Sequence, residues 1–146
     1  TRSRFLKVMP IRIALEGMAT RLATPNFSPE ELVELETLVQ RVSETTQNYD
    51  SKSYLLLNRE LHFTIYEKAD NPELLQMIND LWVKVGPVFT SLFDDGYYRD
   101  HANDVHHHIL YALKTGDAEA AEKFMKQDID LAAKALLPLL PDDTAL

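Results

Sequence analysis

Apolar residues recur three and four positions apart along most of the chain, and no segment shows the two-residue alternation of a β-strand. This pattern predicts six helices, over about residues 10–23, 28–47, 51–69, 72–92, 100–115 and 117–137. The short connections between them indicate a mostly antiparallel bundle. The predicted fold class is therefore all-α, in one domain, because 146 residues suffice for a single core.

Residues that start and stop helices support these bounds. Pro10 suits the first turn of a helix, where a missing backbone N–H is tolerated. Ser28 followed by Glu31 has the spacing of a capping box, and Gly116 is typical of the residue that ends a helix. Pro87 lacks a backbone donor, so the fourth helix is expected to kink nearby.

The first helix carries two neighbouring stripes. The apolar stripe has the spacing of a buried helix face and comprises Ile11, Leu15, Met18 and Leu22. The adjacent stripe comprises Arg12, Glu16 and Ala19. Because Arg12 and Glu16 are one turn apart, an ion pair within the helix is one account of Arg12.

The chain is acidic, with a net charge of −8 and a pI of about 5.0. Nucleic-acid binding by this chain itself is therefore not expected, since phosphate contacts need clustered Lys and Arg. The one basic cluster, Arg2, Arg4 and Lys7, is either a solvated tail or the end of a linker from another domain. The chain does not begin with Met, so it is expected to be a fragment or a trimmed chain.

Two absences bound the class of protein further. Cysteine is missing, which excludes disulfides and thiolate metal sites. No apolar run approaches the ~18–20 residues of a membrane span. We expect no membrane partner and a cytoplasmic location.

The third predicted helix places polar side chains on its apolar stripe. Leu61 and Ile65 lie on one face, and Asn58 and His62, four residues apart, fall on that same face. Burial of polar groups is unfavourable unless they find partners. The sequence therefore indicates that Asn58 and His62 meet other polar groups inside the protein.

The last two helices carry comparable residues. Among three consecutive histidines, His106 shares its face with Ile109, Leu110 and Leu113, whereas His107 and His108 fall on wetter or intermediate faces. Asp128 lies in the middle of the apolar face of the sixth helix, where a carboxylate needs a cation or several donors.

The economical interpretation is that these inward-facing groups meet at a metal ion. Imidazole nitrogens with amide and carboxylate oxygens suit Zn²⁺, Ni²⁺ or Mn²⁺, so the predicted ligands are Asn58, His62, His106 and Asp128. The alternative is that the histidines are hydrogen-bonded core residues. Asp128 would then pair with an arginine such as Arg12, or cap a loop.

Four motifs follow one another along the chain: Arg12-x-x-Leu15-Glu16, Asn58-x-x-Leu61-His62-x-x-Ile65-Tyr66, Asp70-Asn71-Pro72-x-Leu74-Leu75 and His106-x-x-Ile109-Leu110-x-Ala112-Leu113-x-x-Gly116-Asp117. No single motif is specific, but their order along the chain is. With these motifs, the chain over about residues 10–137 resembles the C-terminal effector-binding domain of FadR-type GntR transcription regulators, known as the FCD domain.

The resemblance implies an all-α homodimer that binds a small carboxylate effector, with Arg12 at the effector and Asn58, His62 and His106 as metal ligands. The family commonly has a fourth ligand His where this chain has Asp128. The total charge is unchanged, because the usual set of one Asp with three neutral His and the present set each carry one negative charge. In this chain the carboxylate ligand would come from the sixth helix, at Asp128, and the position on the third helix is Asn58.

The resemblance also implies domain limits. Residues 1–9 would be the end of a linker from a winged helix-turn-helix domain that contacts DNA and lies outside this chain. Residues 10–137 would form the effector-binding and dimerisation domain. Residues 138–146 would be an extended tail. The predicted function is a ligand-sensing regulator domain and not an enzyme. A metal-dependent enzyme and a metal-free helical interaction module are the alternatives, and metal analysis separates the last of these from the others.

Overall fold

The computed structural model describes residues 1–143 and confirms the all-α prediction of six α-helices. Residues 144–146, the end of the predicted tail, lie outside the described residues. No strand occurs within residues 1–143. The elements are α1 (Arg2–Ala23), η1 (Thr24–Asn26), α2 (Pro29–Gln47), α3 (Ser51–Glu67), α4 (Pro72–Val85), η2 (Gly86–Asp94), α5 (Gly96–Thr115), α6 (Ala118–Leu136) and η3 (Leu137–Leu139), where η marks a 3₁₀ helix.

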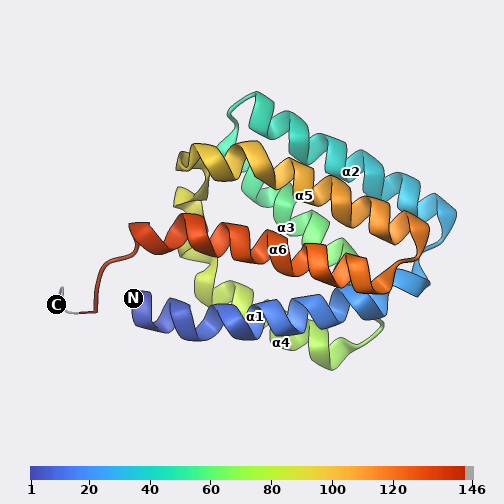
Figure 1. Cartoon of the computed structure of the whole chain (residues 1–146), viewed down its shortest axis with the longest axis horizontal. Helices are drawn as coiled ribbons and strands as arrows, with labels where there is room; N and C mark the ends of the chain where they lie inside the picture. Colours follow the sequence, from blue (N-terminus) through green and yellow to red (C-terminus); the bar gives the residue numbers. More distant parts are fainter. Residues whose placement is uncertain (144–146) are drawn as a thin grey trace.

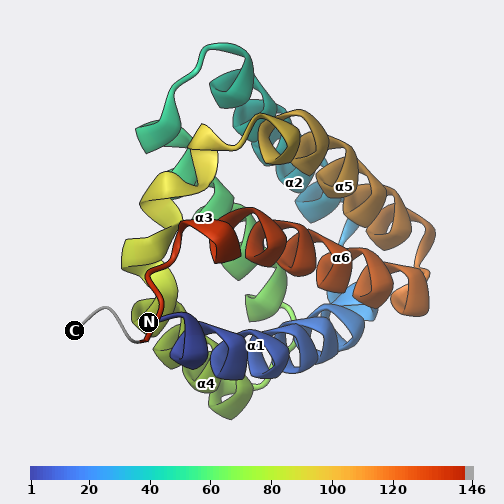
Figure 2. The same cartoon turned by 60° about the vertical axis from the view of Figure 1, so that its left-hand side comes forward.

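The helices form two layers. In Figure 1, α1, α6, α5 and α2 lie side by side in that order, with α3 and α4 behind them. Helix α3 packs against α1 and α2, and α4 packs against α1. Figure 2 shows α3 and α6 facing each other across the interior of the bundle. The polar residues of α3, α5 and α6 therefore project into one shared space.

Side chains that accept from free backbone N–H groups fix most helix starts. Ser28 and Glu31 form the predicted capping box at the start of α2. Gly116 adopts φ 70° after α5, a left-handed conformation that favours glycine. Helix α5 begins at Gly96 rather than after Asp100, because Asp95 accepts from the Tyr98 backbone N–H at 2.8 Å and Tyr98 is buried.

The first helix begins at Arg2, and not near Pro10 as predicted, so the expected linker residues form its first turns. Thr1 accepts from the Arg4 backbone N–H at 3.4 Å, and Phe5 and Met9, one turn apart, are buried. Pro10 lies inside the helix. The burial of Phe5 and Met9 outweighs the one backbone hydrogen bond that Pro10 cannot make.

The burial of the two stripes of α1 is the reverse of what their composition indicates: the stripe with Arg12 and Glu16 is buried, and most of the apolar stripe is exposed. Ile11, Met18 and Leu22 are 50%, 45% and 41% exposed. Arg12 and Glu16 are only 2% and 0% exposed. The helix thus turns its polar stripe inward, where an ion pair and aromatic rings receive it, and leaves an apolar face in solvent.

The predicted kink near Gly86 is a change of helix type: α4 ends at Val85, and a 3₁₀ helix continues from Gly86 to Asp94. The tail expected to be extended from Pro138 first forms η3. The Arg2 side chain then donates to Asp142 at 2.6 Å, which ties the tail to the start of α1. A local turn and an ion pair with α1 therefore position part of the segment that the sequence pattern predicted to be an extended tail.

Candidate metal centre

Three of the four predicted ligands form a cluster inside the bundle. Nε2 of His62 on α3 lies 2.9 Å from Oδ2 of Asp128 on α6, and Nε2 of His106 on α5 lies 3.2 Å from Oδ1 of the same carboxylate. One ligand atom from each residue lies within 4.8 Å of the others, and all three side chains are buried. The predicted register is confirmed for His106, which is buried, and His107, which is exposed; His108, predicted on an intermediate face, is also exposed.

Several buried polar atoms at this cluster lack a hydrogen-bond partner. Neither ring nitrogen of His106 makes a hydrogen bond, nor does Oδ1 of Asp128, although the two residues are close. Oδ1 of Asn58, one turn before His62 on α3, is also buried without a partner. Buried polar atoms without partners are costly. The donor set, two imidazoles with amide and carboxylate oxygens, therefore fits a borderline divalent ion.

The other nitrogen of His62 is held by residues that lie outside the predicted ligand set. Nδ1 of His62 lies 2.9 Å from the Tyr66 hydroxyl, which donates to Oε1 of Glu16 at 2.7 Å. Because the hydroxyl proton is directed at Glu16, the Tyr66 oxygen accepts from a protonated Nδ1. Nε2 of His62, which lies 2.9 Å from Oδ2 of Asp128, is then the nitrogen that faces the cluster, an arrangement commonly found behind metal-bound histidines.

Arg12 does not reach the cluster. Its Nε donates to Oε2 of Glu16 at 2.7 Å, and its guanidinium carbon lies 4.7 Å from the Trp82 ring centroid and 5.2 Å from that of Phe89. The Trp82 indole N–H also donates to Glu16, at 2.7 Å. The ion pair with Glu16, one of the two accounts of Arg12, is thus present, and Glu16 and Tyr66 link Arg12 to His62 indirectly.

The electrostatics of the interior favour an ionised Asp128 among neutral tyrosines. Burial by itself would raise the pKa of Asp128, but His106 and His62 hold the pKa of this carboxyl below its usual range. Tyr54 and Tyr98 share a hydrogen bond of 2.5 Å, and burial, with Asp128 nearby, raises the pKa of both phenols. Asp128 pairs with the two histidines and Arg12 pairs with Glu16, so the alternative pairing of Asp128 with Arg12 is wrong.

The space beside the ligand cluster is small. A cavity of about 10 Å³, lined by His62, His106 and apolar residues including Met125, lies within the core. This volume admits about one water-sized group. Sequence reasoning missed Glu16, Tyr66 and Trp82 as members of the site. Their signals were present, since Tyr66 follows His62 by one turn of α3 and Glu16 follows Arg12 by one turn of α1.

Comparison with known proteins places this geometry in a family. Residues 7–131 match the FCD domain model. The HTH-type transcriptional regulator McbR of Escherichia coli K12 is 32% identical over 126 residues, which cover 82% of this chain and 57% of the relative. The probable D-xylose utilization operon transcriptional repressor of Paenarthrobacter nicotinovorans is 30% identical over 117 residues, covering 80% of this chain and 51% of the relative.

Solved structures agree with the sequence comparison. E. coli McbR/YncC superposes with a TM-score of 0.82 at 29% identity, covering 92% of this chain and 70% of that chain. Streptococcus agalactiae GntR, at 19% identity, shares the fold with a TM-score of 0.74 over 89% of this chain and 58% of its own.

Two further facts bound what these matches mean. The chain spans about half the length of the curated relatives it matches, at 57% and 51%. Within residues 1–143, no helix is both long enough and apolar enough to pass through a bilayer. The match covers most of the chain and its relatives are transcription regulators, so this chain belongs to the FCD domain family found in GntR-type regulators.

Proposed function

We propose that this domain binds a divalent metal through Asn58, His62, His106 and Asp128, and uses it to sense a small organic carboxylate. The observation that carries the proposal is the group of buried ligand atoms without hydrogen-bond partners, on Asn58, His106 and Asp128. A core built only for packing would leave few such atoms, because each costs about 1–3 kcal/mol. Zn²⁺, Ni²⁺ and Mn²⁺ are the ions that suit this ligand set.

The charge of the site favours an anionic effector. Ionised Asp128 and three neutral ligands carry one negative charge, so a divalent ion would leave one net positive charge. Four protein ligands leave one or two positions on an ion that accepts five or six. The metal would supply a Lewis-acidic position for a carboxylate oxygen, while His62 is oriented by Tyr66 and Glu16.

Arg12 is proposed as the second anion-binding group. Its planar guanidinium matches a carboxylate, and in the structure it donates to the carboxylate of Glu16. An effector that binds Arg12 would have to compete with Glu16. This competition couples effector binding to the chain of hydrogen bonds from Glu16 through Tyr66 to His62.

A second copy of the chain is the proposed protein partner. The exposed apolar stripe of α1, made by Ile11, Met18 and Leu22, is the kind of surface that an interface between subunits covers. Each relative named above is a regulator of transcription. We propose that this domain forms a homodimer in the cytoplasm and that DNA is bound only through a separate winged helix-turn-helix domain. The net charge of −8 supports that division of roles.

The test is elemental analysis of protein purified without a metal-affinity column or chelator, followed by thermal unfolding with a panel of mono-, di- and hydroxycarboxylates. The expected result is one equivalent of Zn, Ni or Mn per chain, and a carboxylate that stabilises the metal-loaded protein. A ligand at a hundredfold excess over its dissociation constant adds ~2.7 kcal/mol. Native protein without metal would overturn the metal assignment.

A further inference from the structure

A half-open pocket lies between α3 and the junction of α4 with η2, next to the predicted ligand Asn58. Its volume is about 430 Å³, within the range of small-molecule sites. Most of its wall is apolar, and the full lining is Leu55, Leu56, Asn58, Arg59, Trp82, Val83, Gly86 and Phe89. The much smaller cavity beside the histidines cannot admit an organic molecule, so an effector needs another place to enter.

The one charged group of this pocket suits an anion. Asn58, whose buried Oδ1 is the proposed metal ligand, forms the inner wall and places the pocket next to the candidate metal centre. Arg59 is the single ionisable residue among those that line the pocket. Its guanidinium carbon lies 4.2 Å from the Phe63 ring centroid and 5.6 Å from that of Trp82. Its hydrogen-bond partner in the described chain, Asn79 at 3.0 Å, is neutral and leaves the positive charge uncompensated.

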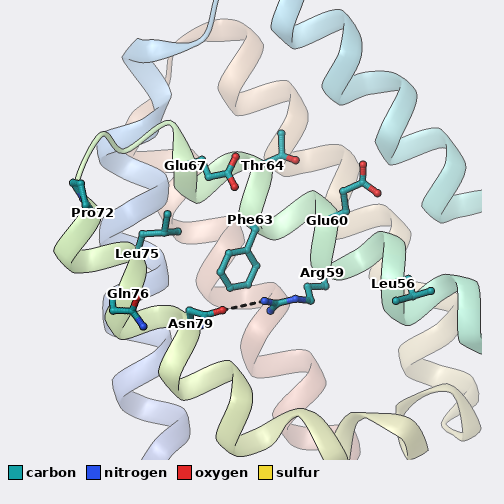
Figure 3. Close-up of a pocket in the computed structure, with 10 residues that line it drawn as sticks. All are labelled: Leu56, Arg59, Glu60, Phe63, Thr64, Glu67, Pro72, Leu75, Gln76 and Asn79. Carbon is teal, nitrogen blue, oxygen red and sulfur yellow. Dashed lines mark hydrogen bonds between the residues drawn. The ribbon is translucent and has the colours of Figure 1, made fainter.

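A larger groove on the other side of Arg59 suits an anion less well. Figure 3 shows Arg59 reaching across it to Asn79, with Phe63 beside it. The groove has a volume of about 870 Å³, but Glu60 and Glu67 also line it. Two carboxylates there would repel an organic anion. The inner pocket, with one cation and no acid in its lining, is therefore the better site.

The inner wall of the pocket separates it from Arg12. Trp82 and Phe89 stack with their ring centroids 5.9 Å apart and their planes 5° apart. The Arg12 guanidinium lies over both rings, and Trp82 donates to Glu16. A ligand that moved Trp82 would thus break one of the hydrogen bonds that hold Glu16 beside Arg12.

The backbone changes type at this wall. The 3₁₀ helix that carries Phe89 has nine residues, from Gly86 to Asp94, and runs of this length are uncommon. Such stretches often mark hinges. Gly86 has helical dihedral angles, and a Cβ built there meets nothing within 4 Å. The junction is therefore open toward the pocket and is not locked by side-chain packing at Gly86.

We propose that this pocket is the entry site, where the effector binds before its carboxylate reaches the metal and Arg12, and that it takes a monocarboxylate with a compact apolar group. Arg59 binds the carboxylate, the walls at Leu55, Val83 and Phe89 receive the apolar group, and Trp82 responds to the occupant. The inference rests on the proposed sensing function and extends it, since it names the class of ligand and the residue that selects it.

The experiment titrates chelator-treated, metal-free protein with cyclohexanecarboxylate and follows the fluorescence of Trp82, the single tryptophan of the chain. The neutral matched compound is cyclohexylmethanol. Gly86→Leu fills the open space of the pocket while keeping helical dihedral angles. Arg59→Gln removes the charge, and Met77→Phe, at an exposed position of α4 that does not line the pocket, is the control.

The expected result is a saturable change with the carboxylate in the parent chain and in Met77→Phe, no change in Gly86→Leu, and binding about tenfold weaker in Arg59→Gln, as for loss of one charge-assisted hydrogen bond. Circular dichroism of each variant checks folding. Equal responses in the parent and Gly86→Leu, or equal affinity for acid and alcohol, would overturn the proposal. Because the protein is metal-free, these outcomes are independent of whether the metal assignment holds.

Discussion

The Tyr66 hydroxyl donates to Oε1 of Glu16 at 2.7 Å, and this one hydrogen bond joins the first helix to the candidate metal centre. Because the Tyr66 hydroxyl donates its proton to Glu16, its oxygen accepts from Nδ1 of His62. Nε2 of His62 is then the nitrogen that faces the candidate metal centre. The carboxylate that neutralises Arg12 thus also orients a proposed metal ligand. The proposed effector and metal positions are therefore connected through Glu16 and Tyr66.

Tyr66→Phe removes this connection while keeping the ring. We expect the affinity for the metal to fall by roughly 10–100-fold, the usual effect of losing a group that orients a ligand histidine. Competition with a chromogenic chelator measures the change. Tyr111→Phe, which alters an exposed tyrosine of α5, should leave the affinity as it is. Unchanged affinity in Tyr66→Phe would show that the hydroxyl has no role at the metal.

Three histidines, one on α3 and two on α5, allow proposed metal ligands to be distinguished from a neighbouring residue that is not a ligand. His62→Ala and His106→Ala should each abolish stoichiometric metal, because each removes a nitrogen of the buried cluster. His107→Ala, at an exposed position next to His106, should retain it. Elemental analysis of the three variants gives the result. Retention of metal in His106→Ala would remove α5 from the site.

Metal should also be released as pH falls below roughly 6, because protons compete for imidazole.

Arg12→Ala should lower the stability of the protein as well as its affinity for the effector. It leaves Glu16 buried and uncompensated, and breaking a buried pair in this way costs ~3–5 kcal/mol. The double variant Arg12→Met with Glu16→Gln should recover much of that loss, since neither charge remains. Urea unfolding of the three proteins measures it. If Arg12→Ala were as stable as the parent, the buried pair would not be a structural element of the core.

The apolar stripe of α1 should form the contact between subunits. Sedimentation at micromolar concentration is expected to give about twice the chain mass of 16.7 kDa. Met18→Glu, which places a charge in the middle of the stripe, should shift the protein to monomer. Val33→Glu, at an exposed site on α2, is the matched control. A dimer that persists in Met18→Glu would place the interface elsewhere.

The six tyrosines form two groups of three by burial. Tyr49, Tyr97 and Tyr111 are exposed. Burial raises the pKa of Tyr54, Tyr66 and Tyr98, so these three should stay protonated while the protein is folded. Above pH ~10 the folded state then binds more protons than the unfolded state, and stability falls as pH rises. Ultraviolet absorbance in a pH titration counts the phenolates. Six phenolates in the folded protein would contradict this.

The sequence by itself determined the all-α class, the capping of α2 at Ser28 and the inward register of His62, His106 and Asp128. These features follow from local periodicity and from side chains that bond to their own backbone, so a single chain segment contains the information. The same logic identified Arg12 and Glu16 as neighbours. It also separated His106 from His107, because the two point to different faces of one helix.

Only the tertiary structure decided which stripe of α1 is buried. Ile11 and Met18 face solvent and Glu16 is enclosed, because Trp82 and Tyr66, from other helices, supply donors to that carboxylate. Partners far apart in sequence set the free energy of burying a charge, and local pattern carries no record of them. For the same reason, sequence pattern did not place the start of α1 at Arg2, because the burial of Phe5 and Met9 in the core stabilises the first turns of the helix.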